Sequence, residues 1–222
     1  MPRRTFLRYT KAQKLDEQTL QKYLLCFKPE TLHHSWQTLP RLRDLFGNEA
    51  PLELEVGCGS AEFLCSLALK HPETNFVGVD ISGRSLFKAA ENASELQVTN
   101  IKFINADFHL IYPLLCADSL QSVYLHFPDP HLKPRCRKRR IFNQGFLDQM
   151  AMSLVVDGRL SVMTDIEELF MEMLQLIEQD TRFEKVHQER YLVGFEPAIK
   201  SHFQRIWEHY GERVFRFEVR RI

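Results

Sequence analysis

The segment FPDPHLKPRCRKRRI places one carboxylate directly before a dense run of positive charge. Asp129 lies between Pro128 and Pro130, whose rings restrict the backbone on both sides of it. The cations that follow, with no acid among them, are Lys133, Arg135, Arg137, Lys138, Arg139 and Arg140. A fixed carboxylate can stabilise positive charge that develops in a reaction, and clustered cations fit nucleic-acid phosphates. A tight turn explains the Pro-Asp-Pro sequence but not the cations beyond it.

Acidic residues also follow the other predicted strands of the chain. The five that come at or near a strand end are Glu55, Asp80, Asp107, Asp129 and Asp165. Taken one at a time, each is explained by a turn or a helix cap. Because the carboxyl ends of parallel strands meet at one edge of a sheet, five acids in register indicate a binding site there.

The elements that position these acids alternate along the chain from residue 52 onward. Apolar runs predict strands at 52–56, 75–80, 101–107, 119–127 and 158–165. Helical spacing predicts helices at 16–27, 61–71, 82–96, 142–154 and 166–180, with Ser60 capping the second of them. An alternating run at 213–221 predicts an antiparallel edge strand. The pattern indicates an α/β fold, Rossmann-like, with a mostly parallel twisted sheet and helices on both faces.

We expect two parts in the chain. Residues 1–50 form a basic N-terminal arm and a helix packed on the core, and residues 51–222 form the catalytic domain. Residues 1–14 carry five cations and no acid, although the whole chain is neutral, with 29 basic and 29 acidic residues. A basic surface can therefore exist locally, and Arg3, Arg4 and Arg8 are candidates for a flexible phosphate-binding arm.

The five cysteines form no Cys-x-x-Cys pair, which favours reduced thiols over disulfides or zinc. We expect no metal site and no membrane span, since no apolar run approaches the roughly 20 residues that a span needs. The basic N-terminus lacks the apolar segment of a secretory signal, so we expect a cytoplasmic protein.

The glycine turn after the first strand, GCGS, limits the choice of cofactor. A dinucleotide site wants Gly or Ala at the sixth position of the turn, where this chain has Glu62. Together with Glu53 and Glu55, this charge would repel a pyrophosphate. S-adenosylmethionine fits better, because it carries a sulfonium and an ammonium and no phosphate.

We therefore assign cofactor roles to the strand ends. Gly57 and Gly59 allow the backbone to pass close to the ligand. Asp80 is placed to accept from both ribose hydroxyls. The remaining predicted cofactor-binding residues are Glu55, Ile81, Asn105, Ala106 and Asp107, of which the last three face the adenine edge.

The segment FPDPHLKPRCRKRRI resembles the signature of the tRNA (guanine-N7-)-methyltransferase family, a Phe-Pro-Asp-Pro turn followed by spaced Lys and Arg. The likeness runs from about Leu54 to the C-terminus and includes ELEVGCGSAEFL, FINAD and the strand ending in Thr164-Asp165. It implies a class I methyltransferase fold, S-adenosylmethionine as donor, S-adenosylhomocysteine as product, and N7 of a guanine in the tRNA variable loop as target.

The resemblance also implies residue roles. It gives Asp129 a central role, either stabilising charge on the methylated purine or accepting hydrogen bonds from guanine N1 and N2. Predicted substrate-binding residues are Lys133, Arg137, Arg139, Arg140, Asp165, Ser201 and Gln204. The chain departs from the family pattern at Ala61 (family Gly), Asp80 (Glu), Ser82 (a basic residue) and Ser201 to Gln204 (Thr-x-x-Glu). The last change removes a charge from the pocket.

Two other functions stay open at this point. The chain could methylate another RNA or a small molecule, an alternative that Gln204 keeps in view. It could instead be an RNA-binding member of the fold that methylates poorly, which the presence of Asp129, Asp165 and the glycine turn disfavours. The sequence leaves a monomer and a homodimer equally open, and the need for a partner subunit undecided.

Overall fold

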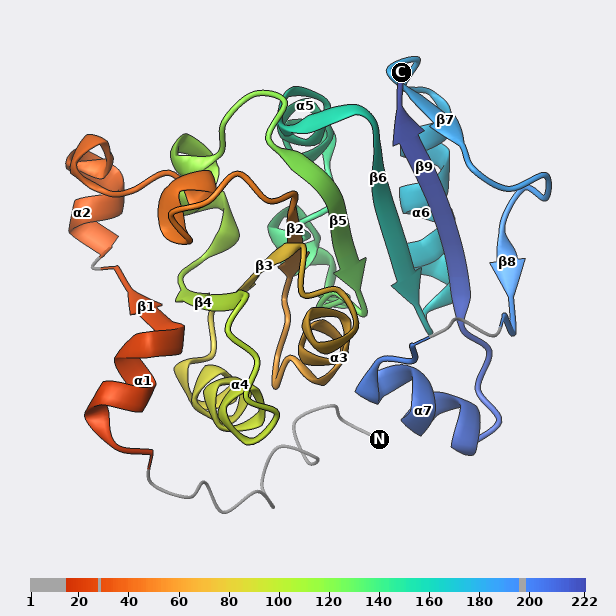
Figure 1. The fold of residues 1–222 in the computed structure, drawn as a ribbon. Helices are drawn as coiled ribbons and strands as arrows, with labels where there is room; N and C mark the ends of the chain where they lie inside the picture. Colours follow the sequence, from red (N-terminus) through yellow and green to blue (C-terminus); the bar gives the residue numbers. More distant parts are fainter. Residues whose placement is uncertain (1–14, 28, 196–198) are drawn as a thin grey trace.

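The computed structural model describes residues 15–27, 29–195 and 199–222. Its strands form one mixed β-sheet (Figure 1). Within these residues the sheet has nine strands in the order β1-β4-β3-β2-β5-β6-β9-β7, and β8 pairs with β9 beside this path. The strands are β1 Leu24–Cys26, β2 Leu52–Val56, β3 Asn75–Asp80, β4 Ile101–Asn105, β5 Leu120–His126, β6 Leu154–Thr164, β7 Phe183–Lys185, β8 Leu192–Val193 and β9 Phe215–Arg221.

The strand order reverses at β2. From there β3 and β4 extend to one side and β5 and β6 to the other, all in parallel, whereas β9 runs antiparallel to β6. Ligands of open α/β sheets bind outside the carboxyl ends of the strands at such a reversal. The predicted doubly wound, mostly parallel sheet is confirmed, and its reversal lies between the exits of β2 and β5.

Helices cover both faces of the sheet, with α3 and α4 on one face and α5 and α6 on the other (Figure 1). In α4 the buried Leu86, Ala89, Ala90 and Ala93 recur at helical spacing, which gives one apolar side. Each large side chain buried in this way stabilises the fold by about 1.5–3 kcal/mol. The helices are α1 Glu17–Tyr23, α2 Pro29–His34, α3 Glu62–Lys70, α4 Gly83–Glu95, α5 Gln144–Ser153, α6 Glu167–Glu178 and α7 His202–His209, with 3-10 turns η2 Trp36–Thr38, η3 Leu42–Leu45, η4 Phe108–Leu114 and η5 Pro134–Arg139.

The strands predicted at 52–56 and 75–80 match β2 and β3, and the next two predictions overlap β4 and β5. The fifth strand, β6, begins earlier than residue 158, at Leu154. A register shift opposite Leu120 and Ser122 of β5 accommodates the added length. All five strand exits therefore lie where the sequence predicted them, within a few residues.

The predicted helix over 16–27 is wrong in its second half. Asp16 caps α1 by accepting from Thr19 N at 2.8 Å, but the helix ends at Tyr23. The next residues form β1, which pairs in parallel with β4, Leu24 opposite Phe103. The exposed edge of β4 offers backbone partners that a local helical pattern does not reveal. This pairing joins the described part of the first fifty residues to the sheet.

Two further predictions need correction. The C-terminal strand β9 is antiparallel as predicted, but it is no edge strand, because it lies between β6 and β7. Three-residue strands such as β7 carry too little pattern to be detected. Ser60 does not cap α3: the N-cap is Ala61, at φ 53° and with no side-chain hydrogen bond. After Gly57 and Gly59, Ala61 is a third residue of this turn with a positive φ.

Candidate functional site

The glycine turn at the exit of β2 needs its glycines for conformation. Gly57 has φ 77° and Gly59 has φ 56°, values that L-residues with a Cβ rarely adopt. A Cβ built at either position meets no atom within 4 Å, so the turn is open on that side. The amide of Gly57 donates to the backbone oxygen of Val79 at 2.8 Å, which ties the turn to β3. The turn is thus fixed in place and accessible to a ligand.

Asp80, at the exit of β3, joins the two loops that flank it. Its Oδ2 accepts from Gly59 N at 2.9 Å and its Oδ1 accepts from Ser82 N at 2.7 Å. Burial raises the pKa of this carboxyl, and the backbone donors partly offset that rise. Ser82 itself caps α4 by accepting from Ser85 N. Each carboxylate oxygen keeps a further lone-pair direction for a ligand donor.

The exit of β4 is aligned with the exit of β3 by side-chain and backbone donors. Nδ2 of Asn105 donates to the backbone oxygen of Asp80 at 3.0 Å, and the amide of Ala106 donates to the same oxygen at 3.2 Å. Asp107 is exposed and accepts from His109 N at 3.0 Å, which caps η4. Beside them Ile81 leaves 75% of its surface exposed, a large apolar side chain at the rim of the site.

Glu55 is buried beneath the glycine turn and lacks a full set of partners. The residue is 4% exposed, and its Oε2 has no hydrogen-bond partner. Burial, followed by the charge of Asp80, raises its pKa to about 8. A buried carboxyl without a partner is costly, and a cation bound beside it would remove that cost. These carboxyl groups therefore fit a positively charged ligand.

The Pro-Asp-Pro turn leaves the sheet at the exit of β5, next to β2. Phe127 before the turn has φ 54° and His131 after it has φ 41°, each a conformation that costs a non-glycine residue about 1–2 kcal/mol. The amide of Phe127 donates to Met163 O of β6 at 2.7 Å. The Asp129 side chain is 75% exposed, and its Oδ1 accepts from His131 N at 3.0 Å. The carboxylate is accessible on a turn that is held at its base.

The cations after this turn fall into two groups. Lys133, Arg135, Lys138 and Arg139 are exposed, and within the described residues they form no ion pair. Arg137 and Arg140 instead pair with acids of α6. The expected phosphate contacts of Lys133 and Arg139 therefore have accessible side chains.

Arg137 and Arg140 differ from each other in burial. Arg137, about half exposed, pairs with Glu168 at 2.6 Å and with Glu172 at 3.4 Å. Arg140 is only 8% exposed, pairs with Glu172, and donates from Nε to Pro130 O at 2.9 Å. This environment does not suit the phosphate contact that was expected of Arg140, because the side chain is buried and its Nε and Nη1 donate within the protein.

The exit of β6 and helix α7 supply the remaining predicted residues. Asp165 follows the buried Thr164 and is half-buried; the N-cap of α6 is Ile166, not Asp165. Ser201 caps α7 by accepting from Gln204 N at 3.1 Å. Gln204 is fully buried, and its Nε2 donates to Glu208 at 2.8 Å, while its Oε1 has no partner.

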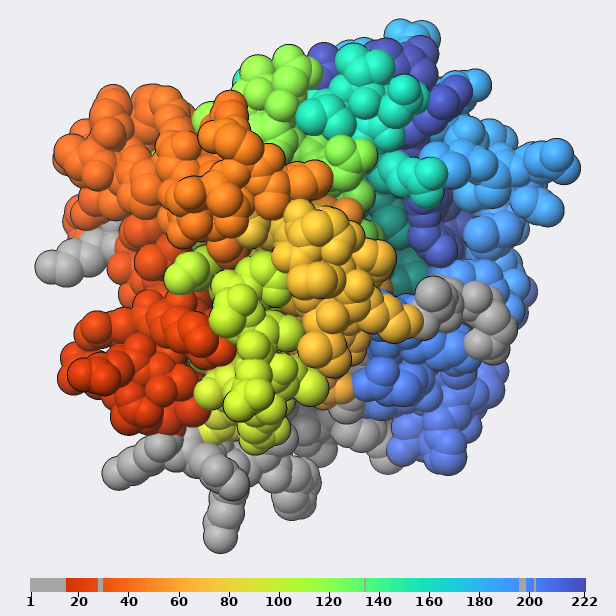
Figure 2. Space-filling view, in the orientation of Figure 1, coloured from red at the N-terminus to blue at the C-terminus, as the bar shows by residue number. Residues whose placement is uncertain are grey.

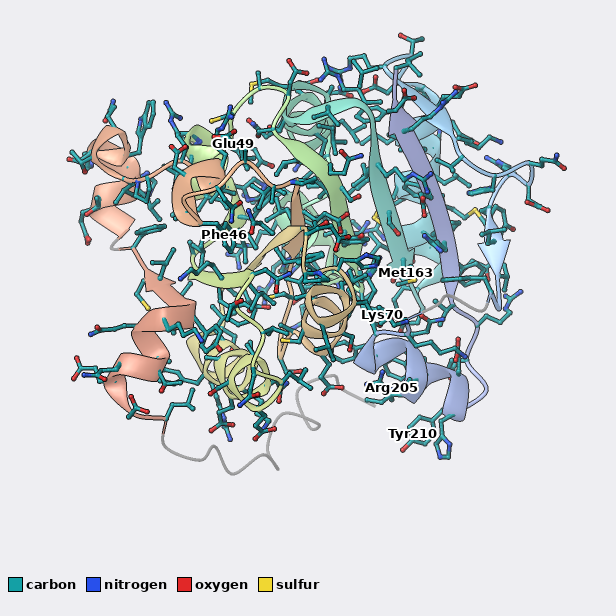
Figure 3. The ribbon with its side chains drawn as sticks, in the orientation of Figure 1. Phe46, Glu49, Lys70, Met163, Arg205 and Tyr210 are labelled. Atoms are coloured by element: carbon teal, nitrogen blue, oxygen red, sulfur yellow. The ribbon has the colours of Figure 1, made fainter. Side chains whose placement is uncertain are left out.

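Helix α7 lies against α3, the helix that follows the glycine turn. Arg205 pairs with Glu62 of α3 at 2.6 Å, and the two helices meet in the space-filling view (Figure 2). Met163, near the end of β6, packs with Phe203 and Trp207 of α7; Figure 3 labels Met163 and Arg205. The exits of β2 to β6 and α7 thus surround one region of the molecule.

The sequence of this chain is similar to those of known proteins. A family model described as "Putative methyltransferase" matches residues 49–217. A curated tRNA (guanine-N(7)-)-methyltransferase from Rubrobacter xylanophilus is 51% identical over 94% of this chain and 95% of its own length. Another of that name, from Chloroherpeton thalassium, is 36% identical over 93% of this chain and 92% of its own length. The chain belongs to the tRNA (guanine-N7-)-methyltransferase family.

Solved methyltransferases share the fold of this family member. The antibiotic-resistance methyltransferase Kmr matches with a TM-score of 0.56 and 16% identity, over 89% of this chain and 94% of its own. A 16S rRNA (adenine(1408)-N(1))-methyltransferase from Catenulisporales acidiphilia, solved with its cosubstrate SAM, matches with a TM-score of 0.55 and 12% identity, over 88% of this chain and 92% of its own. The predicted Rossmann-like methyltransferase fold and the enzyme class are confirmed.

Glu168 and Glu172 lie beside the candidate site, where they pair with Arg137 and Arg140, and the sequence analysis did not single them out. They lie four residues apart on α6, so both side chains fall on one side of the helix. That side contacts residues 133–140, the basic segment, through Arg137 and Arg140. The signal available in the sequence was an acidic pair at helical spacing in a chain with an unbalanced basic run.

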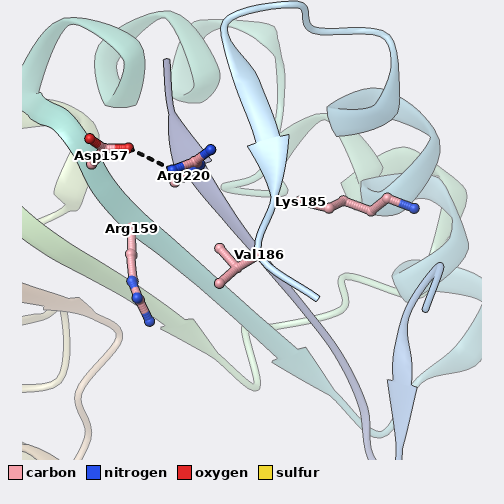
Figure 4. A pocket seen from close by; sticks show the side chains of 5 residues that line it. All are labelled: Asp157, Arg159, Lys185, Val186 and Arg220. Carbon is pink, nitrogen blue, oxygen red and sulfur yellow. Dashed lines mark hydrogen bonds and ion pairs between the residues drawn. The ribbon is translucent and has the colours of Figure 1, made fainter. Parts of the chain in front are cut away.

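A hollow elsewhere on the methyltransferase does not belong to this site. It has a volume of about 280 Å³ and is lined by Asp157, Arg159, Lys185, Val186 and Arg220 (Figure 4). Arg159 precedes Thr164 by five residues, about 16 Å along the strand. Asp157 pairs with Arg220 at 2.9 Å, so the charges of the hollow partly cancel.

Three expectations concern features outside the site. The arm residues Arg3, Arg4 and Arg8 lie outside the described residues. None of the helices that the structure describes has the length and apolar character to cross a bilayer. Over the same described ranges, His, Cys, Asp and Glu side chains do not gather in threes as a metal ion would need.

Proposed function

We propose that this chain transfers a methyl group from S-adenosylmethionine to N7 of a guanine in the tRNA variable loop. One observation carries the proposal: the buried, partly unpartnered Glu55 lies at the exit of β2, and the exposed Asp129 follows the adjacent strand β5. A site for a cationic ligand is thereby next to an accessible carboxylate and a basic segment. The names of the curated relatives support the same reaction.

The residues at the exits of β2 to β4 fit S-adenosylmethionine. Bound there, it supplies an electrophilic methyl group on a positively charged sulfur. Glu55 would accept from the ligand's ammonium, and Asp80 from its ribose hydroxyls through the lone pairs that Gly59 and Ser82 leave unused. The exposed Ile81 would cover one face of the adenine, with Asn105, Ala106 and Asp107 along its edge and Gly57 beneath the ligand.

The reaction requires little proton transfer by residues of the protein. Guanine N7 has a free lone pair and no proton to lose, so no general base is needed, and alignment of the reactants supplies most of the rate. The methylated purine is positively charged. Asp129 would stabilise that charge as it develops, and its exposed carboxylate is also able to accept from guanine N1 and N2.

The tRNA backbone would meet the exposed cations of the basic segment. Lys133 and Arg139 are our principal phosphate contacts, with Arg137 shared between tRNA and α6. Asp165 is our candidate for contact with the target base. Ser201 and Gln204 would act by setting the position of α7, since both side chains are buried and bonded within the protein.

The proposal is tested with purified protein, labelled S-adenosylmethionine and unmodified tRNA, followed by borohydride–aniline cleavage at N7-methylguanosine. The expected result is label at one guanosine, lost in Asp129→Ala. Label on another RNA or on a small molecule, with none on tRNA, would overturn the substrate. Tight tRNA binding without any transfer would instead make the chain a binding member of the family.

A further inference from the structure

Arg140 differs from every other described cation of the basic segment in being buried. Its residue surface is 8% exposed, whereas its neighbour Arg139 is exposed. A guanidinium is removed from water only where its hydrogen bonds are replaced. The partners of Arg140 therefore reveal what the side chain does.

Those partners come from the Pro-Asp-Pro turn and from α6. Nε of Arg140 donates to Pro130 O at 2.9 Å, and the guanidinium pairs with Glu172. The planar guanidinium directs its donors along fixed directions, so one side chain sets the position of Pro130 relative to Glu172.

The backbone of Arg140 is held as firmly as its side chain. Its amide donates to Arg137 O at 3.0 Å and ends η5. Its carbonyl accepts from Nδ2 of Asn143 at 3.1 Å, and Asn143 caps α5 by accepting from Phe146 N. The backbone of Arg140 is thus anchored to η5 and α5, in addition to the contact of its side chain with the turn.

The turn needs such a contact at its end. Its entrance is fixed by the hydrogen bond from Phe127 N to Met163 O, 2.7 Å long. Its exit passes into His131, which is in the left-handed region at φ 41°. Within the described residues, Arg140 is the side chain that donates to the carbonyl between these two ends, at Pro130.

We propose that Arg140 is a positioning residue: through Pro130 O, and with Glu172 as its counter-ion, it fixes the exit of the turn and so the direction of Asp129. We do not count it as a phosphate contact, because the residue is only 8% exposed and its Nε and Nη1 already donate to Pro130 O and Glu172. This inference rests on the proposed function for the role of Asp129, but the contacts that carry it do not.

The test compares Arg140→Gln with Arg139→Gln, a neighbour of the same type that is exposed. Arg140→Gln is expected to lower the single-turnover rate of methyl transfer at saturating tRNA about 10²-fold, because misplacement of a reacting group by about 1 Å has that effect. Its Kd for tRNA is expected to stay within about twofold of wild type. Arg139→Gln is expected to raise the Kd and to reduce the salt dependence of binding by about one phosphate.

Three further variants keep the result interpretable. Glu172→Gln preserves shape, removes the counter-ion and is expected to lower the rate in the same way as Arg140→Gln, by a smaller factor. Arg190→Gln breaks an exposed ion pair with Glu178, at the other end of α6, and is expected to change neither rate nor Kd. Arg140→Lys keeps the charge without the fixed donor directions and is expected to recover only part of the rate.

Hydrogen exchange of residues 127–133 supplies a readout that does not depend on activity. Exchange is expected to be faster in Arg140→Gln and in Glu172→Gln, and unchanged in Arg139→Gln. The inference is overturned if Arg140→Gln weakens tRNA binding and its salt dependence while rate and exchange stay normal. Absence of methyl transfer by the wild-type protein would count against the proposed function, and hydrogen exchange would still decide on Arg140.

Discussion

The two halves of the site are held in place by different kinds of contact. At the exits of β2, β3 and β4, which we call the cofactor edge, Glu55 is buried and Asp80 accepts from the backbone amides of Gly59 and Ser82. In residues 127–141, the turn and basic segment, the acid is exposed, and Arg137 and Arg140 are held by Glu168 and Glu172 of α6.

The difference suits the two ligands of the proposed function. Backbone hydrogen bonds keep a site in one geometry for a small ligand, at a cost in desolvation that the ligand's charge relieves. Exposed ion pairs are screened over about 8–10 Å at ordinary salt and exchange readily for phosphates. We therefore expect salt and charge substitutions to act on the turn and basic segment, and buried polar substitutions to act on the cofactor edge.

The largest effect should come from Asp129→Asn, which keeps the shape of the side chain and removes its charge. The rate of methyl transfer is expected to fall about 10²–10³-fold, because one electrostatic partner of the developing charge is lost. The Kd of S-adenosylmethionine, measured by calorimetry, is expected to stay within about twofold of wild type. Asp157→Asn is the matched control, since Asp157 is also an exposed acid but lies in β6, at φ 63° and outside the site. A weaker cofactor affinity in Asp129→Asn would break the division between the two halves.

Asp80→Ala should show the opposite pattern. Two hydrogen bonds between the ribose and a charged acceptor, about 1.5–3 kcal/mol each, are lost, so the Kd of the cofactor is expected to rise about 10²-fold or more. The affinity for tRNA is expected to be unchanged. Near-ultraviolet circular dichroism checks that the glycine turn survives without its partner. Unchanged cofactor affinity in a folded variant would remove Asp80 from the site.

The positions of the strand exits followed from the sequence more closely than the environment of the basic segment did, for a physical reason. The strand exits follow from apolar runs and the glycine turn, which are local signals, and Glu55, Asp80 and Asn105 all lie within one or two residues of such an exit. Which cations are available is decided by acids of α6, about thirty residues later in the chain. Arg139 and Arg140 are neighbours of one residue type, and only the fold makes the first exposed and the second buried.

The same distinction between local and long-range signals explains the errors in the predicted fold. The run Leu24–Cys26 is short and apolar, and its strand state depends on the free edge of β4. The interior position of β9 depends on β7, which has three residues. Both features are set by contacts between distant segments, so local periodicity could not have decided them.

Glu55→Gln tests how the cofactor edge depends on pH. The folded-state pKa of Glu55 is raised to about 8 from an ordinary 4.5, so its contribution to stability is present below about pH 4.5 and is lost as pH rises through 8. Between pH 6 and pH 8 the wild-type free energy of unfolding is therefore expected to fall relative to Glu55→Gln, by up to about 1.4 kcal/mol per pH unit. Urea unfolding at three pH values measures this slope.

Cofactor binding should depend on the same proton in the opposite sense. A cationic ligand favours the ionised carboxylate, so binding releases a proton and the wild-type affinity is expected to rise up to tenfold per pH unit toward pH 8. Calorimetry in buffers of different ionisation enthalpy measures the proton, and Glu55→Gln is expected to lack both effects. A pH-independent wild-type affinity would mean that the unpartnered oxygen of Glu55 does not face the ligand.

The smallest effect is expected at the junction of the two halves, in α7. Gln204→Glu replaces the Nε2 donor, bonded to Glu208 and to Phe195 O, by a carboxylate oxygen that faces two acceptors inside the protein. Loss of a buried donor makes us expect a destabilisation of about 1–2 kcal/mol at pH 8, with a fall of a few degrees in Tm. At pH 5 the loss should be smaller, because a protonated carboxyl can donate to Glu208.

Gln144→Glu is a closely matched control, because Gln144 donates to Asp148 four residues later with the same spacing but on an exposed surface. Its expected cost is a few tenths of a kcal/mol, since water screens a like-charged pair at this spacing. If Gln204→Glu were instead neutral in stability and raised the rate of methyl transfer, the side chain would have to face the ligand. Helix α7, which Arg205 joins to α3, would then belong to the catalytic surface and not to its support.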